Sequence, residues 1–282
     1  MARNHRAIPA AGRKFAFRDK VALVTGSAQG IGKTIAASFG DAGARVAICD
    51  IDRERSNATV LELRKAGIDA RYHAVDLSKR GEPSRMVAEV TEKFGRLDIL
   101  VNNARAGTRS GLLEETEENW DLTMSVGLRA AFFASKEAIP VMRSEGGGSI
   151  VNICSISAFL VSQESASYHA AKAGMMQLTR YLAMYAGDRQ VRVNAVLPGF
   201  IVQDEDRKRY LRNDNNSYRA RAEGCHPLRK VGSPGDVADA TLFFCSDSAN
   251  FITGQTIIVD GGLSIQDSWT AVSAAATRWE KE

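Results

Sequence analysis

The sequence predicts a single α/β domain built on a doubly wound, Rossmann-type parallel sheet of seven strands, with helices on both faces. Short apolar runs rich in β-branched residues alternate with longer helical stretches along the chain, which is typical of a parallel sheet wrapped by helices. The runs are continuously apolar, as in strands that are buried on both faces. No break in composition and no internal repeat marks a second domain within the 282 residues.

The expected elements alternate in strict order. Strands are predicted at 21–25, 45–50, 70–75, 98–103, 149–155, 191–198 and 255–260. Helices are predicted at 33–43, at 54–67, at 84–95, within 115–143, at 166–187 and at 235–247. Right-handed crossovers between such strands produce a doubly wound sheet, and ligands then bind at the carboxyl ends of the strands.

The two ends differ from the central domain, which is predicted to span residues 18–265. Residues 1–17 are basic and lack the apolar stretch of a secretory signal, so we expect a flexible arm and a cytoplasmic location. Residues 266–282 form a tail that is expected to be helical, because its apolar residues recur at helical spacing: Trp269, Val272, Ala276 and Trp279. Two tryptophans on one face favour packing against another surface.

Composition excludes several classes of protein. The 37 basic and 33 acidic residues give a net charge of +4, which is too mild to indicate nucleic-acid binding. No apolar run approaches the roughly 18 residues of a membrane span. The four cysteines contain no C-x-x-C pair and the four histidines show no ligand spacing, so no metal site is expected.

The stretch "TGSAQGIGKT" at 25–34 raises a choice between an ATP loop and a dinucleotide loop. A P-loop needs four residues between its first Gly and the Gly before Lys, whereas Gly26 and Gly32 are separated by five. The loop follows a strand and opens a helix, and Asp50 ends the next strand 18 residues beyond Gly32. An acid at that distance can bind the adenosine ribose hydroxyls. The loop, with Gln29, Gly30 and Ile31, is therefore predicted to bind a dinucleotide.

Asp50 also bears on which dinucleotide is bound. A 2′-phosphate beside this carboxylate would be repelled, so NAD is expected and NADP is disfavoured. Arg53 is close in sequence, but we expect it to point outward from the start of the next helix.

Three reactive side chains are predicted to converge at the same edge of the sheet. Tyr168 and Lys172 are four residues apart on an expected helix and therefore share a face. Ser155 lies 13 residues before Tyr168, at the carboxyl end of the fifth strand. A free tyrosine has a pKa of about 10, and a neighbouring ammonium favours the phenolate that could act as a base.

These motifs resemble those of the short-chain dehydrogenase/reductase family, including its 3-oxoacyl-carrier-protein reductases and sugar-alcohol dehydrogenases. The resemblance covers residues 18–265 and rests on "TGSAQGIG", "NNA" at 102–104, the Ser155–Tyr168–Lys172 spacing, "PG" at 198–199 and "TGQTIIVDGG". It implies that this triad catalyses hydride transfer between a nicotinamide and a carbonyl or alcohol. It also implies cofactor contacts along the chain, at Asp76, Leu77, Asn103, Ala104, Tyr168, Lys172, Pro198, Gly199 and Ile201.

The chain departs from the family pattern at three positions. Arg105 stands where the family commonly has Gly in "NNAG". Gly127 replaces an Asn that the family uses to hold a water in a proton relay to the Lys. Gln203 falls where a Thr often holds the nicotinamide amide.

Substrate specificity is expected to depend on residues 200–230, which resemble the family's mobile lid. Eight Arg or Lys lie between 207 and 230; they are either outward charges of a soluble lid or receptors for an anionic substrate. Arg105, Arg109 and Gln203 are substrate candidates, and sugars or polyols compete with 3-oxoacyl groups as the substrate. The alternative function is a non-catalytic NAD(H) sensor. The family commonly forms homodimers and homotetramers, so we expect a homo-oligomer.

Overall fold

The computed structural model describes residues 15–267, 269–271 and 273. Its centre is one parallel sheet of seven strands in the order β3-β2-β1-β4-β5-β6-β7, which confirms the predicted doubly wound fold. The reversal of strand order between β1 and β4 creates the crevice in which ligands of such folds bind. The strands are β1 Val21–Thr25, β2 Arg45–Asp50, β3 Ala70–Ala74, β4 Ile99–Asn102, β5 Gly148–Ile153, β6 Val191–Pro198 and β7 Thr256–Val259.

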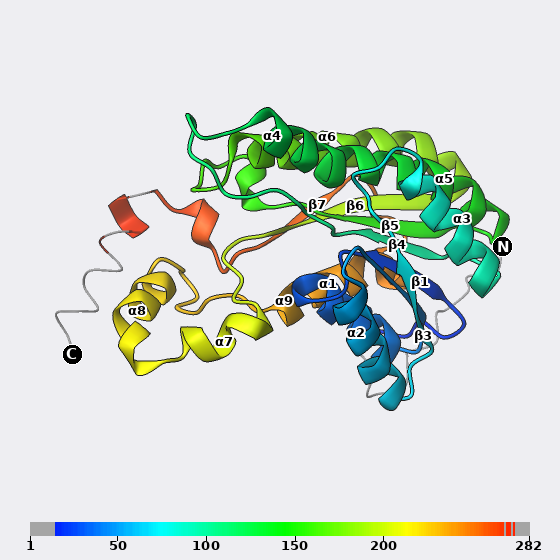
Figure 1. Ribbon diagram of the computed structural model, residues 1–282, viewed down its shortest axis with the longest axis horizontal. Coiled ribbons are helices and arrows are strands. Elements are labelled where there is room, and N and C mark those ends of the chain that lie inside the picture. Colours follow the sequence, from blue (N-terminus) through cyan, green and yellow to red (C-terminus); the bar gives the residue numbers. More distant parts are fainter. Residues whose placement is uncertain (1–14, 268, 272, 274–282) are drawn as a thin grey trace, which may run out of the picture.

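Helices cover both faces of the sheet (Figure 1), with α1, α2 and α9 on one face and α3, α4, α5 and α6 on the other. Two further helices, α7 and α8, stand away from the sheet between β6 and α9. No helix in the described part of the chain is long and apolar enough to span a membrane. The helices are α1 Gly30–Asp41, α2 Arg53–Lys65, α3 Glu82–Phe94, α4 Glu117–Met124, α5 Ala130–Ser144, α6 Ala166–Ala186, α7 Asp204–Tyr210, α8 Asn216–Gly224 and α9 Pro234–Cys245.

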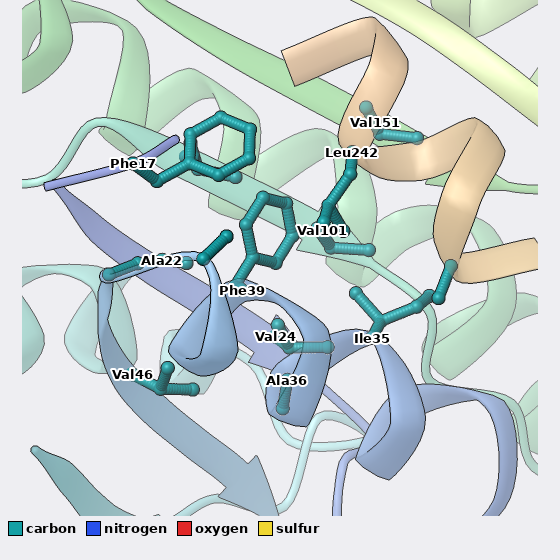
Figure 2. Packing of buried hydrophobic residues seen from close by; sticks show 14 of the residues in the cluster. Phe17, Ala22, Val24, Ile35, Ala36, Phe39, Val46, Val101, Val151 and Leu242 are labelled. Atoms are coloured by element: carbon teal, nitrogen blue, oxygen red, sulfur yellow. The ribbon is translucent and has the colours of Figure 1, made fainter. Parts of the chain in front are cut away.

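The continuous apolar character of the strands follows from this arrangement. Successive side chains of a strand point to opposite faces, so Ala22 and Val24 of β1 pack with Phe39 of α1 and Leu242 of α9 (Figure 2). The intervening residues of β1 pack into a second cluster with α3, α5 and α6. Both faces of each central strand are therefore buried, which is why no polar alternation is visible in the sequence.

The folded domain includes the last residues before β1. Phe17 is buried, its ring meets that of Phe39 edge-on at 5.1 Å between centroids, and its amide donates to the carbonyl of Ala42. Residues 1–14 of the predicted arm lie outside the described residues.

A π-helical turn, Ser125–Arg129, joins α4 to α5 within the long helical stretch expected at 115–143. Gly127 is buried at its centre. π turns interrupt helices frequently at functional sites, and this one faces the N-terminal half of α6: a Cβ at Gly127 would lie 3.4 Å from the Cβ of Ala171.

The tail is described only at its start. The carboxylate of Asp267 accepts hydrogen bonds from the amides of Trp269 and Thr270, and the side chain of Trp269 is exposed. Of the predicted apolar stripe, Val272, Ala276 and Trp279 lie outside the described residues.

Candidate active site

One cleft, with a volume of about 1470 Å³, contains every candidate site residue that the sequence suggested. It runs along the carboxyl ends of the strands, and residues of helices α7 and α8 also line it. The structure thus brings together positions that are up to 177 residues apart: Gly26, Gln29, Gly30, Ile31, Gly32, Asp50, Asp76, Leu77, Asn103, Ala104, Arg105, Arg109, Ser155, Tyr168, Lys172, Pro198, Gly199, Ile201 and Gln203.

The glycine-rich loop is packed too tightly for side chains. Gly26 has a φ of +62°, and a Cβ on it would lie 2.7 Å from the Cα of Ala104. A Cβ on Gly32 would lie 2.2 Å from the carbonyl oxygen of Gly26. Asn103 fixes the loop from the other side, because its amide donates to the carbonyls of Thr25 and Gly26, both at 2.9 Å. The loop backbone is therefore held open to a ligand at the start of α1.

Asp50 lies at the end of β2, beside this loop. Its carboxylate accepts the amide of Ala28 and the amide of Asp52, each at 3.0 Å. A carboxylate offers about four lone-pair sites, so Asp50 keeps capacity to accept hydroxyl groups. Arg55, in the first turn of α2, is held by Gln29 and Asp52.

Asp76 follows β3, the strand that pairs with β2 in parallel and ends beside Asp50. Hydrogen bonds from the hydroxyl of Ser78, at 2.6 Å, and from its amide lower the pKa of the Asp76 carboxyl, despite the opposing effect of partial burial. The group is thus held ionised and oriented at a position where the resemblance implies a contact with the cofactor.

Tyr168 and Lys172 occupy the first turns of α6, as the sequence predicted. The helix begins at a Ser165 cap whose hydroxyl accepts the amide of Tyr168. The Lys172 side chain is 4% exposed, its Nζ donates to the carbonyl of Ile153 at 2.7 Å, and it lies 5.6 Å from the centre of the Tyr168 ring. The ammonium of Lys172 and the phenol of Tyr168 therefore lie next to each other in the cleft.

Ser155 follows β5 and is nearly buried. Its hydroxyl oxygen accepts the amide of Ser157 at 3.1 Å, which leaves the hydroxyl proton free to be donated to a bound oxygen. Ser155, Tyr168 and Lys172 all line the same cleft, so the structure supplies a donor, an acid–base group and a cation around one space.

Sequence reasoning missed a hydrogen-bonded chain behind Ser155. The hydroxyls of Ser157 and Ser162 are 3.0 Å apart, and the amide of Ser162 donates to Nε2 of His169 at 3.0 Å. Because Nε2 accepts, Nδ1 carries the proton and donates to the carbonyl of Ser165 at 2.8 Å. His169 directly follows Tyr168, but nothing in its spacing signals that it fixes the loop between β5 and α6.

The three candidate substrate residues have different surroundings. Arg109 is paired with Glu164, with both Nε and Nη2 at 2.8 Å from the carboxylate. The guanidinium of Arg105 lies over the Tyr168 ring, 5.6 Å from its centre. Gln203 lies against the glycine-rich loop: a Cβ on Gly30 would be 2.6 Å from its Oε1, and this oxygen is buried without a hydrogen-bond partner.

The cysteines do not contribute a reactive thiol to the cleft. Cys154 follows β5 and lines it, but burial raises the pKa of its thiol to about 11. Within the described ranges, no three His, Cys, Asp or Glu side chains are grouped so that they could hold a metal ion.

Comparison with known proteins decides the family. A family model described as enoyl-(acyl carrier protein) reductase matches residues 26–264, which include the glycine-rich loop and the triad. The chain belongs to the short-chain dehydrogenase/reductase family. It is therefore an oxidoreductase whose relatives act on CH–OH groups, and the family implies a nicotinamide dinucleotide as cofactor.

Relatives of the family share nearly the whole domain. The 3-oxoacyl-(acyl-carrier-protein) reductase FabG of Thermotoga maritima is 35% identical over 246 residues, covering 87% of this chain and 98% of its own. A candidate galactose dehydrogenase, GalD of Rhizobium meliloti, is 38% identical over 247 residues, covering 87% and 95%. The solved structure of a candidate gluconate dehydrogenase from Agrobacterium tumefaciens has a TM-score of 0.80 at 31% identity, covering 88% and 97%.

The residues present fit a dinucleotide of the family. The glycine-rich loop leaves backbone where side chains would fill the site, and Gln203 aims a buried, unpartnered amide oxygen at the same loop. A buried amide oxygen without a partner costs free energy, and a hydrogen-bond donor on a bound ligand would satisfy it.

Proposed function

We propose that this protein is an NAD(H)-dependent dehydrogenase or reductase that interconverts a secondary alcohol and a ketone on a polar or anionic substrate. The observation that carries the proposal is the single cleft that joins Ser155, Tyr168 and Lys172 to the glycine-rich loop and Asp50. Sugars, polyols and 3-oxoacyl groups are the substrate classes in view. The names of the relatives include a 3-oxoacyl group, a sugar and a sugar acid.

The chemistry assigns one role to each residue of the triad. The nicotinamide, when bound, exchanges a hydride with the substrate carbon. Tyr168 takes the alcohol proton as the carbonyl forms and returns it in the reverse direction. Ser155 donates a hydrogen bond to the substrate oxygen as charge changes there, and Lys172 supplies the positive charge beside the phenol.

The preference for NAD(H) rests on Asp50. Its carboxylate would hydrogen-bond the two ribose hydroxyls and repel a 2′-phosphate. Arg55, a nearby cation that could attract a phosphate, is already engaged by Gln29 and Asp52. NADP(H) would therefore bind against the like charge of Asp50.

The cofactor prediction is tested by kcat/KM for both cofactors with one substrate. We expect wild-type protein to prefer NAD(H), and Asp50→Ser to narrow that preference at least about tenfold, because a contact worth about 1.4 kcal/mol changes a ratio tenfold. Glu62→Gln, which removes an acid from the outer face of α2, is the matched control. A wild-type preference for NADP(H) would contradict the assignment.

A non-catalytic NAD(H) sensor of the same fold remains the alternative function. The two functions differ in a direct measurement, in which NADH binding is followed by fluorescence and turnover is screened over alcohols and ketones. Binding without turnover across the panel supports the sensor, whereas turnover of any member supports the enzyme.

The proposal extends to a homo-oligomer, a dimer or tetramer, in the cytoplasm. Large apolar side chains are exposed on neighbouring helices: Phe133 on α5, and Tyr181, Met184 and Tyr185 on α6. Such a patch is costly in water and suits a second copy. The four free cysteines suit a reducing compartment. A monomer mass by sedimentation at micromolar protein would contradict the assembly.

A further inference from the structure

A rigid loop presents Arg105 to the reacting centre. On its N-terminal side, the amide of Ala104 donates to Oγ1 of Thr25 at 3.1 Å. On its C-terminal side, Gly107 has a φ of +89° and approaches α4 so closely that a Cβ would lie 2.1 Å from Oγ1 of Thr123. The amide of Thr108 then donates to Asn119 at 2.8 Å. The backbone of Arg105 is thus fixed from both sides by the sheet and by α4.

The guanidinium of Arg105 has no carboxylate partner among the described residues. It lies over the ring of Tyr168, 5.6 Å from the ring centre, and it lines the cleft. Arg109, four residues later, differs from Arg105 because two of its guanidinium nitrogens bind the carboxylate of Glu164. An aromatic ring holds a guanidinium less strongly than a bidentate carboxylate does, so Arg105 keeps its hydrogen-bonding capacity.

We infer that Arg105 binds the carboxylate of the substrate, and that the substrate is a short hydroxy acid or the corresponding oxo acid. This inference rests on the proposed function, because it assigns the reacting oxygen to Tyr168. The planar fork of an arginine matches the two oxygens of a carboxylate. With the guanidinium on the ring of the acid–base residue, the carboxylate lies a few bonds from the carbon that reacts.

The reaction balances without a further reactant. The C–H bond of the secondary alcohol breaks and its electron pair leaves as hydride to NAD, while the O–H proton passes to Tyr168, so that a ketone forms. The carboxylate is unchanged, and its charge stays paired with Arg105 in both directions. The arginine therefore selects and orients the substrate and takes no part in proton or hydride transfer.

A phosphate of the cofactor is the other source of negative charge that Arg105 could meet. The two sources can be separated by measuring NADH binding in the absence of substrate. Replacing a residue that binds the cofactor changes this affinity, whereas replacing a residue that binds only the substrate does not. Arg209 of α7 is the rival residue: it also lines the cleft and has no carboxylate partner within the described part of the chain.

The test compares short 2-, 3- and 4-hydroxy acids with their methyl esters at saturating NAD. Wild-type protein is expected to prefer at least one acid over its ester. Arg105→Gln should lower kcat/KM for that acid about 10- to 100-fold, as expected for a charged hydrogen-bonded pair, and should lower it much less for the ester, so that the preference for the acid is lost. Arg105→Lys should lose less, and Arg209→Gln should keep the wild-type preference for the acid.

A second measurement does not depend on turnover. Butyrate, a carboxylate that cannot be oxidised at these positions, is titrated into the wild-type complex with NADH, followed by the cofactor fluorescence. Binding is expected in wild type and is lost in Arg105→Gln, while the affinity of NADH alone stays the same. A loss of NADH affinity in Arg105→Gln, or a loss of acid preference in Arg209→Gln instead, overturns the assignment.

The failure of this inference is distinct from the failure of the proposed function. If wild-type protein oxidises neutral alcohols or esters but shows no preference for acids and does not bind butyrate, Arg105 is not a carboxylate receptor and the dehydrogenase assignment stands. If it binds NADH and oxidises nothing, the proposed function fails, and the butyrate titration still decides the role of Arg105.

Discussion

Tyr168 is the residue on which the proposed chemistry depends most. Tyr168→Phe keeps the ring and its packing but removes the oxygen that moves the proton, so kcat should fall at least about a hundredfold. The Arg105 and Lys172 contacts to the ring are retained in this variant, so the melting temperature should change little. Near-wild-type turnover by Tyr168→Phe would remove this residue from the mechanism.

At the scale of single residues, the sequence predicted those that belong to recognisable motifs. It did not predict the side-chain contacts between residues far apart in the chain. The meeting of the triad positions and the glycine-rich loop in one cleft was predictable, because the carboxyl ends of parallel strands lie at the same edge of the sheet. The pairing of Arg109 with Glu164 joins residues 55 positions apart on two loops, and no local pattern encodes such a contact. The same is true of the hydrogen bond from Ser162 to His169, which depends on how the loop after β5 turns.

At the scale of elements, the strands were predictable and the interruption between α4 and α5 was not. β2 and β6 have the predicted bounds, and β3 ends one residue earlier, at Ala74. Buried strands can be predicted from short apolar runs that are bounded by turns. The π-helical turn Ser125–Arg129 keeps nearly helical spacing, so the apolar pattern of 115–143 could not reveal it.

The π-helical turn makes a specific prediction for Gly127. A Cβ there would meet only the Cβ of Ala171 within 4 Å, at 3.4 Å, which is ordinary contact. Because Gly in a helix costs about 0.5–1 kcal/mol relative to Ala, Gly127→Ala should raise the free energy of unfolding by up to about 1 kcal/mol. Gly174→Ala is the matched control, since its Cβ would lie 2.9 Å from Leu128. Urea unfolding measures both, and a less stable Gly127→Ala would show that the turn requires Gly.

The whole molecule should lose stability in mild acid because of one histidine. His73 in β3 is 2% exposed, both its ring nitrogens lack partners, and burial, aided by Lys93 and Arg71 against Glu89, lowers its pKa from 6.5 to about 4. Between pH 6.5 and pH 4, His73 therefore takes up a proton in the unfolded chain but stays neutral in the folded chain. Above pH 6.5 His73 is neutral in both states, and the free energy of unfolding falls as the pH is lowered from there toward 4.

The effect of His73 is separable from that of the buried carboxyl of Asp98. Asp98 is buried, which raises its pKa, but hydrogen bonds from Arg96, the Val21 amide and Lys20 outweigh burial and lower it below 3.8, so its stabilising effect is lost only in stronger acid. His73→Phe should therefore reduce the loss of unfolding free energy between pH 7.5 and pH 5 by about 1–2 kcal/mol. Urea unfolding of both proteins at the two pH values measures this difference. The absolute stability of the variant is not the criterion, because removing two unpartnered nitrogens changes it at every pH. An unchanged pH dependence would show that folding does not lower the pKa of His73.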